Sequence, residues 1–195
     1  MAYGVVVIGS SLGGLDAVST VLAALPEAFP LPIVIAQHRG TAPPADGRLQ
    51  GIWQRHTRLG VCDAEDKSPM VPGRVYIAPA DYHLMIEARD RLALSTEGPV
   101  LWARPSIDVL FHSAADTYGE DVIGVILTGA SADGSQGIRA IRARGGCALV
   151  QDPSDAVCDV MPRAALSATS VNHVLGLQYL GPMLCALAGL PAEVR

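Results

Sequence analysis

Uninterrupted apolar runs alternate along this chain with segments in which apolar residues recur every three or four positions. Residues 5–8 are all β-branched, and residues 121–127 form a second, largely apolar run. Such runs predict strands that are buried on both faces of a sheet. Similar runs predict further strands at 32–36, 60–64, 74–78, 147–151 and 171–175.

Segments with helical spacing follow most of these strands. They predict helices at 15–25, 48–55, 107–118, 135–142, 161–167 and 182–188, with Ser106 as the N-cap of the third. Strands that alternate with helices in this way predict an α/β fold, with a doubly wound, mostly parallel sheet covered on both faces. Residues 83–87 and 92–95 alternate around a polar turn, which predicts an antiparallel hairpin at the edge of the sheet.

The composition is that of one folded domain without a general affinity for polyanions. The chain has 195 residues, 50% of them hydrophobic, so we expect a single domain spanning residues 1–195. A net charge of −5 gives no sequence-independent attraction to nucleic acid or anionic membranes. Residues 174–190 carry no charge, but Gln178, Gly181 and Pro182 interrupt them, and we expect core packing there, not membrane insertion.

Two further features favour a cytoplasmic protein. No cationic segment precedes the first apolar run, because Arg39 is the first basic residue, so we expect no secretory signal. The four cysteines contain no C-x-x-C pair and lie mostly in apolar surroundings. We therefore expect buried, reduced thiols, not disulfides or a zinc site.

The first predicted strand leads into Gly9-Ser10-Ser11-Leu12-Gly13, which fits the pattern G-x-S-x-G. Small residues let such a strand-to-helix turn bend sharply enough to expose the middle hydroxyl, here Ser11. The unpaired N–H groups at the start of the following helix would lie beside this hydroxyl and suit an oxyanion. This turn therefore predicts a nucleophilic serine.

A phosphate-binding turn is the main alternative for the same segment. A dinucleotide-binding turn has the pattern G-x-G-x-x-G, and an acidic residue about 20 positions further on binds a ribose hydroxyl. Ser11 replaces the second glycine, and the next strand ends in Gln37-His38-Arg39 without an acid. The sequence therefore argues against dinucleotide binding.

Ser11, His38 and Asp133 each follow a predicted buried strand. In an open α/β sheet the carboxyl ends of the strands face one crevice, where ligands bind at the point at which the strand order reverses. A hydroxyl, an imidazole and a carboxylate can serve as nucleophile, general base and orienting group. Taken singly, each residue is also typical of packing or turns, so the hypothesis of a catalytic triad depends on their coincidence at one edge.

The other histidines give weaker signals. His56, His112 and His173 form no spaced ligand set with cysteine or aspartate, so we predict no metal site. His83 lies on the predicted hairpin, where we expect it to pack or to contact substrate.

Eight segments carry a resemblance to a known family: Ile8-Gly9-Ser10-Ser11-Leu12-Gly13-Gly14, Gln37-His38, Val75-Tyr76-Ile77-Ala78-Pro79, Arg104-Pro105-Ser106-Ile107-Asp108-Val109-Leu110-Phe111, Leu127-Thr128-Gly129, Asp133-Gly134, Gln151-Asp152 and Met161-Pro162-Arg163-Ala164-Ala165. In this order they resemble the catalytic domain of the bacterial chemotaxis protein-glutamate methylesterases, the CheB-type domain. The resemblance covers nearly the whole chain.

The resemblance implies a three-layer α/β/α domain whose triad falls on Ser11, His38 and Asp133. It implies hydrolysis of glutamate γ-methyl esters on the cytoplasmic helices of chemoreceptors, deamidation of certain glutamines, and no cofactor. We expect the oxyanion and the substrate to be bound by Leu12, Gly13, Gly14, His83 and Met161. A crevice lined by residues 39–47, Tyr82, His83 and Met161 would accept the receptor helix.

The chain also departs from the family pattern. Leu12 follows the nucleophile where threonine is usual, Ala130-Ser131 replaces Met-Gly, and Val160 replaces a glycine before Met161. These departures leave the triad residues in place but predict an altered specificity. Because Met1 leads almost directly into the first strand, we expect a stand-alone domain without the receiver domain that covers the site in many members. Two alternatives stay open: a hydrolase of another ester or amide, and a non-catalytic docking domain.

Overall fold

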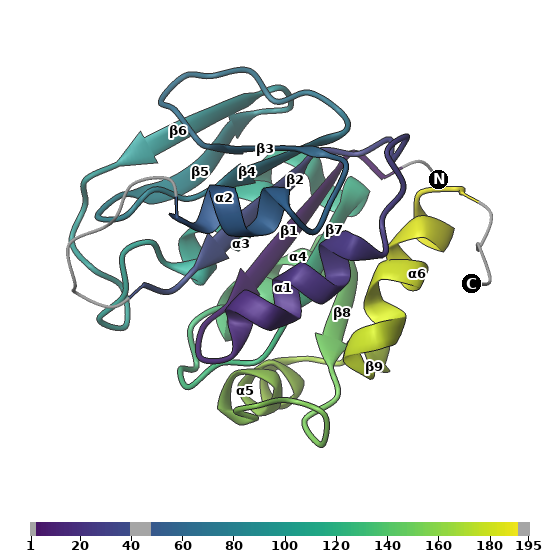
Figure 1. Cartoon of the computed structure of the whole chain (residues 1–195). Coiled ribbons are helices and arrows are strands. Elements are labelled where there is room, and N and C mark those ends of the chain that lie inside the picture. Colours follow the sequence, from purple (N-terminus) through teal and green to yellow (C-terminus); the bar gives the residue numbers. More distant parts are fainter. Residues whose placement is uncertain (1–2, 40–47, 191–195) are drawn as a thin grey trace.

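A computed structural model describes residues 3–39 and 48–190 of the chain. Its main sheet has seven strands, all parallel, in the order β3-β4-β2-β1-β7-β8-β9 (Figure 1). The strands are β1 (Val5–Ser10), β2 (Ile33–Gln37), β3 (Gly60–Asp63), β4 (Arg74–Ile77), β7 (Val122–Ile126), β8 (Cys147–Gln151) and β9 (His173–Leu175). Each of the strands predicted for this sheet is present.

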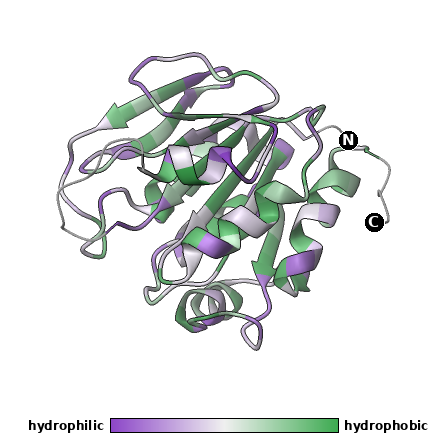
Figure 2. Ribbon diagram, in the orientation of Figure 1, coloured by the Kyte–Doolittle hydropathy of each residue, from purple (hydrophilic) through white to green (hydrophobic). Residues whose placement is uncertain are grey.

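Alternate residues of the central strand face opposite layers of helices, which confirms the three-layer α/β/α fold. Val5 and Val7 pack in the apolar cluster that includes the helices α3, α4 and α5, whereas Val6 and Ile8 pack with α1 and α6. Figure 1 shows α1 and α6 in front of the sheet, with α3 and α4 behind it. Because both faces are covered, the central strands β1, β2 and β7 contain hardly any polar residues, and Figure 2 shows the middle of the sheet as mostly hydrophobic.

The helices begin and end close to the predicted positions, with one exception. They are α1 (Gly14–Ala23), α2 (Arg48–Gln54), α3 (Ile107–Tyr118), α4 (Ser135–Ala143), α5 (Val160–Ala168) and α6 (Leu177–Leu187), and a short 3-10 turn, η1 (Gly119–Asp121), follows α3. The exception is α6, for which a start at Pro182 was predicted. Proline favours the first turn of a helix, but here Pro182 lies inside α6. The preceding Gly181 packs against Ala24, where an added Cβ would lie only 2.5 Å from the Ala24 side chain.

The predicted antiparallel hairpin is confirmed, but it forms a separate sheet of two strands, β5 (His83–Ala88) and β6 (Arg91–Ser95). It is attached to α3 and not to a strand edge. The Ser113 hydroxyl accepts a hydrogen bond from the Ile86 N–H (3.0 Å), and the Thr117 hydroxyl donates one to the Ile86 carbonyl (3.0 Å). Side chains from the middle and the end of α3 therefore hold the hairpin against that helix.

The predicted cysteine chemistry agrees with the structure in part. The four cysteines, all of which lie within the described residues, form no disulfide; Cys147 and Cys185 are buried as predicted, whereas Cys62 and Cys158 are half-buried. Within the described residues, no helix combines the length and the apolar character that a bilayer span requires.

Candidate active site

The predicted triad comes from the three central strands of the sheet. Ser11 directly follows β1, His38 directly follows β2, and Asp133 lies in the turn between β7 and α4. Strand β1 has β2 on one side and β7 on the other, so the strand order reverses at β1. This is the position at which open α/β sheets bind ligands.

The backbone around Ser11 is held by its neighbours on both sides. The Ser11 N–H donates to the Thr128 carbonyl (3.0 Å), and the Ser11 carbonyl accepts from the Gln37 side-chain amide (2.8 Å). The same Gln37 amide also donates to the His38 carbonyl (3.0 Å). Because Ser10 and Gln37 are register partners, Ser11 and His38 lie side by side at the end of β1 and β2. The Gln37 side chain thus positions the backbone of both Ser11 and His38. In the sequence, Gln37 stood out only as part of a motif.

The Ser11 side chain is available for chemistry. Ser11 is half-buried, and among the described residues its hydroxyl has no hydrogen-bond partner. Its Cβ lies beside Gly129, where an added Cβ would approach it to 2.8 Å. A glycine at position 129 therefore leaves room for the nucleophile.

The turn after Ser11 offers two backbone donors for an oxyanion. The Gly14 N–H donates to the Ser11 carbonyl (2.9 Å), so it is already used, contrary to the expectation that it binds the oxyanion. Among the described residues, no partner accepts from the N–H groups of Leu12 and Gly13. Gly13 has φ +80°, a conformation that favours glycine and lets the chain turn directly into α1. The backbone N–H groups of Leu12 and Gly13 are therefore the candidate donors to an oxyanion in this turn.

His38 and Asp133 are in direct contact. The His38 Nε2 atom lies 2.8 Å from Asp133 Oδ2, in a site where Asp133 is fully buried. A buried carboxylate accepts the Nε2 proton, which leaves Nδ1 unprotonated. In the neutral ring, Nδ1 is therefore the nitrogen that remains able to accept a proton.

The carboxylate of Asp133 is bound by the N-terminus of α3. Oδ1 accepts hydrogen bonds from the Ser106 hydroxyl (2.9 Å) and the Asp108 N–H (3.0 Å), and Oδ2 accepts one from the Ile107 N–H (2.7 Å). Burial raises the pKa of Asp133, but hydrogen bonds from His38, Asp108 and Ile107 outweigh it, so that the pKa lies below its usual value. Asp133 is therefore held as an anion, which suits the role of orienting His38.

The sequence predicted only part of the hydrogen bonding around Asp133. Ser106 was predicted as an N-cap, and it does accept from the Val109 N–H, but its hydrogen bond to Asp133 was not predicted. Asp108 completes a reciprocal arrangement, because its own carboxylate accepts from the Gly137 N–H in α4 (2.7 Å). Burial raises the pKa of Asp108. Two carboxylates thus join the starts of α3 and α4. Asp133, which precedes α4, accepts from the backbone of α3, and Asp108 in α3 accepts from the backbone of α4.

His83 is buried, and both of its ring nitrogens have partners within the protein. Its Nδ1 atom accepts from the Ser106 N–H (3.1 Å), and its Nε2 atom lies 3.0 Å from the Gly98 carbonyl. With both ring nitrogens engaged, the expected substrate contact is not supported, and packing is the better description. His83 acts on the site through Ser106, which binds Asp133.

Met161 lies close to Ser11, because both side chains border Gly129. Its Cε atom lies 2.7 Å from the position of an added Gly129 Cβ, close to Ser11. Met161 is itself buried, and its N–H donates to the Gly129 carbonyl (2.9 Å). Tyr82 is exposed. Of the loop predicted at 39–47, only Arg39 belongs to the described residues.

The chain resembles known proteins in both sequence and structure. The model of the CheB methylesterase family matches residues 6–184. The chain belongs to this family. The crystal structure of the Thermotoga maritima CheB methylesterase catalytic domain superposes with a TM-score of 0.90 at 32% identity, covering 96% of this chain and 100% of that one.

Curated CheB-type relatives extend the likeness. A putative protein-glutamate methylesterase/protein-glutamine glutaminase of Leptospira interrogans is 44% identical over 187 residues, which are 96% of each chain. The protein-glutamate methylesterase FrzG of Myxococcus xanthus is 42% identical over 186 residues, 93% of this chain and 54% of that protein. The chain thus spans nearly the whole of one relative and about half of the other.

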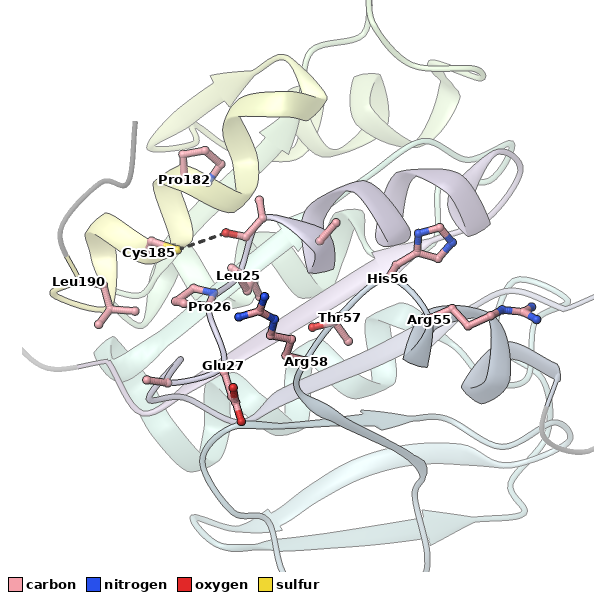
Figure 3. A pocket seen from close by; sticks show the side chains of 13 residues that line it. Leu25, Pro26, Glu27, Arg55, His56, Thr57, Arg58, Pro182, Cys185 and Leu190 are labelled. Carbon is pink, nitrogen blue, oxygen red and sulfur yellow. Dashed lines mark hydrogen bonds between the residues drawn. The ribbon is translucent and has the colours of Figure 1, made fainter. Parts of the chain in front are cut away.

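Figure 3 shows the side chains that line a separate groove, whose volume is about 770 Å³. Its segments 23–28 and 55–58 precede β2 and β3, so it lies at the opposite end of the sheet from the triad. It is lined by the end of α1, the turn after α2 and part of α6, and it includes the exposed Arg55 and Arg58. None of its lining residues belongs to the triad or to the Ser11 turn. It therefore does not change the assignment of the active site.

Proposed function

We propose that this chain is a serine hydrolase that removes methyl groups from glutamate γ-methyl esters on the cytoplasmic helices of chemoreceptors, in chemotaxis or related signalling. The observation that carries the proposal is the contact of 2.8 Å between His38 and the buried Asp133, next to Ser11 at the end of β1. Membership of the CheB methylesterase family and the activities for which its relatives are named support the choice of substrate.

The reaction begins when the Ser11 oxygen attacks the ester carbonyl and His38 Nδ1 takes the hydroxyl proton. The negative charge on the carbonyl oxygen is stabilised by the N–H groups of Leu12 and Gly13. His38 then gives the proton to the departing methoxide, so methanol leaves and a glutamyl ester on Ser11 remains. Water attacks this ester with His38 again as base, which restores Ser11 and releases glutamate.

Asp133 has two tasks in this scheme. It accepts the Nε2 proton of His38, which keeps Nδ1 free to act as the base, and its charge stabilises the imidazolium that forms during each proton transfer. The hydrogen bonds from Ser106, Ile107 and Asp108 keep the carboxylate ionised and in place. All steps use protein groups and water, so we propose no cofactor.

Deamidation of glutamine follows from the same geometry. The amide carbonyl of glutamine occupies the position of the ester carbonyl, and His38 gives its proton to the departing amide nitrogen, so that ammonia leaves instead of methanol. The proposed partners are methylated receptor helices in the cytoplasm. Nucleic acid is not a proposed partner, since the net charge is −5.

Labelling with a serine-directed fluorophosphonate tests the proposal. Wild-type protein should be labelled at Ser11, and Ser11→Ala should lose both the label and nearly all ester hydrolysis. The neighbouring Ser10 is a matched control, because its hydroxyl is fully buried and donates to the Gln37 side chain. Ser10→Ala should still be labelled. An unlabelled wild-type protein, or a Ser11→Ala variant that hydrolyses the ester at the wild-type rate with an unchanged circular dichroism spectrum, would refute the serine mechanism.

Competition between substrates tests the choice of a protein-bound ester. A methylated receptor fragment should inhibit turnover of a simple glutamate ester, because both occupy the same site. Indifference to the fragment would favour a hydrolase that acts on small esters or amides.

A further inference from the structure

The groove in Figure 3 combines an apolar floor with a cationic wall. Arg55, His56 and Arg58, from the turn after α2, form the wall. In Figure 3, Arg55 lies at one end of the groove and Leu190 at the other, with Arg58 between them. We refer to this site as the basic groove. Its floor includes small and apolar residues from the end of α1, from α6 and from the turns after both helices: Ala24, Leu25, Pro26, Pro182, Cys185 and Leu190.

Close contacts between α1 and α6 fix the floor of the basic groove. Gly181 of α6 lies against the end of α1, where an added Cβ would be 2.5 Å from the Ala24 side chain. The Cys185 Sγ donates to the Ala24 carbonyl (3.9 Å), which is the dashed line in Figure 3. The Leu190 N–H donates to the Cys185 carbonyl (2.9 Å) and so holds Leu190 beside the groove. The floor is therefore preformed by the packing of two helices.

The turn that carries the wall is anchored to the same layer of helices. The His56 N–H donates to the Trp53 carbonyl (2.9 Å), and the buried Trp53 indole donates to the Leu15 carbonyl in α1 (3.1 Å). By contrast, the side chains of Arg55 and Arg58 are exposed, and neither has an ion pair or a hydrogen bond with another described residue. Two guanidinium groups thus extend from a fixed turn without a bound anion.

The charge of the basic groove is opposite in sign to that of the whole chain. Among the described residues that line it, two arginines face a single acid, Glu27, whereas the net charge of the chain is −5. A guanidinium group binds a carboxylate through two parallel hydrogen bonds. The wall therefore favours carboxylates over neutral groups.

The layout of the groove fits a peptide segment better than a small anion. Its volume of about 770 Å³ is that of a ligand pocket, but its charged groups stand on an exposed wall and do not converge inside it. An apolar floor with a polar, solvent-accessible border is the anatomy of a protein interface. A small anion would leave the floor in water, whereas a peptide with aliphatic side chains between carboxylates would use both parts.

We propose that the basic groove is a docking site for an acidic segment of a partner protein. One or two aliphatic side chains of the segment contact the floor, and flanking carboxylates bind Arg55 and Arg58. Because the groove and the triad lie at opposite ends of the sheet, the docking site and the active site can be occupied at the same time. This inference goes beyond the proposed function and does not depend on it.

Three fluorescein-labelled peptides of equal length test the proposal by fluorescence anisotropy. The first contains Glu-Glu-Leu-Leu-Glu-Glu, the second has glutamine in place of each glutamate, and the third has serine in place of each leucine. The first should bind at least about tenfold more tightly than either of the others, because each of these lacks the carboxylates or the aliphatic groups. Its affinity should fall as the salt concentration rises, since exposed charge pairs are screened.

Charge-reversal variants locate the binding site. Arg55→Glu and Arg58→Glu should each weaken binding of the first peptide by at least about tenfold. Arg139→Glu is the matched control, because Arg139 is also exposed but lies on α4, in the helix layer on the other face of the sheet. It makes the same change in net charge and should bind the peptide as the wild type does. All three variants should keep the wild-type circular dichroism spectrum.

Other outcomes would overturn the proposal. Absence of binding for all three peptides, or an equal loss of affinity in Arg58→Glu and Arg139→Glu, would refute a specific docking site. Competitive inhibition of ester hydrolysis by the first peptide would place that peptide in the active site instead. If the wild-type protein is a dimer in sedimentation experiments, Arg58→Glu is a monomer and no peptide binds, the groove is a self-association surface. Peptide binding requires no turnover, so a failure of the proposed function would leave this result unchanged.

Discussion

Replacement of Asp133 by asparagine separates the two roles assigned to this carboxylate. Asp133 accepts four hydrogen bonds, from His38, Ser106, Ile107 and Asp108. Asparagine keeps one carbonyl oxygen but presents an NH₂ group to two of these donors. The replacement therefore removes the charge. In either orientation of the amide it leaves one buried backbone N–H, that of Ile107 or of Asp108, facing another donor.

The effect on catalysis follows from the tautomer of His38. When the NH₂ group faces Nε2, that nitrogen must accept, and the proton moves to Nδ1, which can then no longer take the Ser11 proton. Loss of the correct tautomer lowers kcat by about 10⁴-fold in a triad. We therefore expect ester hydrolysis by Asp133→Asn to fall by about four orders of magnitude, measured as methanol release.

The effect on stability comes from the α3 end of the site. Hydrogen bonds to a charged acceptor contribute about 1.5–3 kcal/mol each, and an unsatisfied buried donor costs about 1–3 kcal/mol. Allowing for the two bonds that asparagine keeps, we expect the free energy of unfolding at pH 7 to fall by about 3 kcal/mol, measured by urea denaturation.

The pH dependence gives an independent check. The pKa of Asp133 is lowered in the folded protein, because the hydrogen bonds outweigh the effect of burial. A lowered folded pKa stabilises the protein above the unfolded pKa, about 3.9 for aspartate, and this stabilisation is lost as the pH falls through the folded value. The difference in unfolding free energy between wild type and Asp133→Asn should therefore shrink below about pH 4.

Ser106→Ala is the matched control for this experiment. It removes one donor to Asp133 Oδ1 but leaves the contact between Asp133 and His38. It should lower the unfolding free energy by about 1–2 kcal/mol and change kcat by less than about tenfold. The tautomer argument is wrong if Asp133→Asn retains more than a tenth of wild-type activity, or if the two variants lose equal activity.

Two further substitutions probe the walls of the site. Gly129→Ala should sharply reduce turnover and lower the free energy of unfolding by about 1–3 kcal/mol, because its Cβ would overlap Ser11 and Met161. Steady-state kinetics measures the turnover, and urea denaturation measures the stability. Turnover at the wild-type rate would contradict the close approach of Ser11 and Met161 to Gly129. His83→Ala should lower the unfolding free energy by about 1–3 kcal/mol, because it leaves the buried Ser106 N–H without its acceptor, while KM for the ester stays near its wild-type value. A large rise in KM without loss of stability would instead restore a direct substrate contact for His83.

Local patterns in the sequence were sufficient for the elements and for the catalytic residue types. The β-branched run of β1, the glycine turn at Ser11 and the N-cap at Ser106 depend on residues that are close along the chain, and each was predicted. The parallel sheet then places the ends of β1, β2 and β7 at one edge, so the grouping of Ser11, His38 and Asp133 could also be expected.

Contacts between distant segments were decided only by the tertiary structure. His38 and Asp133 are 95 residues apart, and which ring nitrogen faces the carboxylate depends on how two loops pack. Packing between elements likewise determines three other features: the hydrogen bond between His83 and Ser106, the binding of Asp133 by α3, and the start of α6 before Pro182. A sequence pattern specifies which groups each element carries and on which face; the hydrogen-bond partner of a buried group is determined when the elements meet, because burial requires every such group to find one.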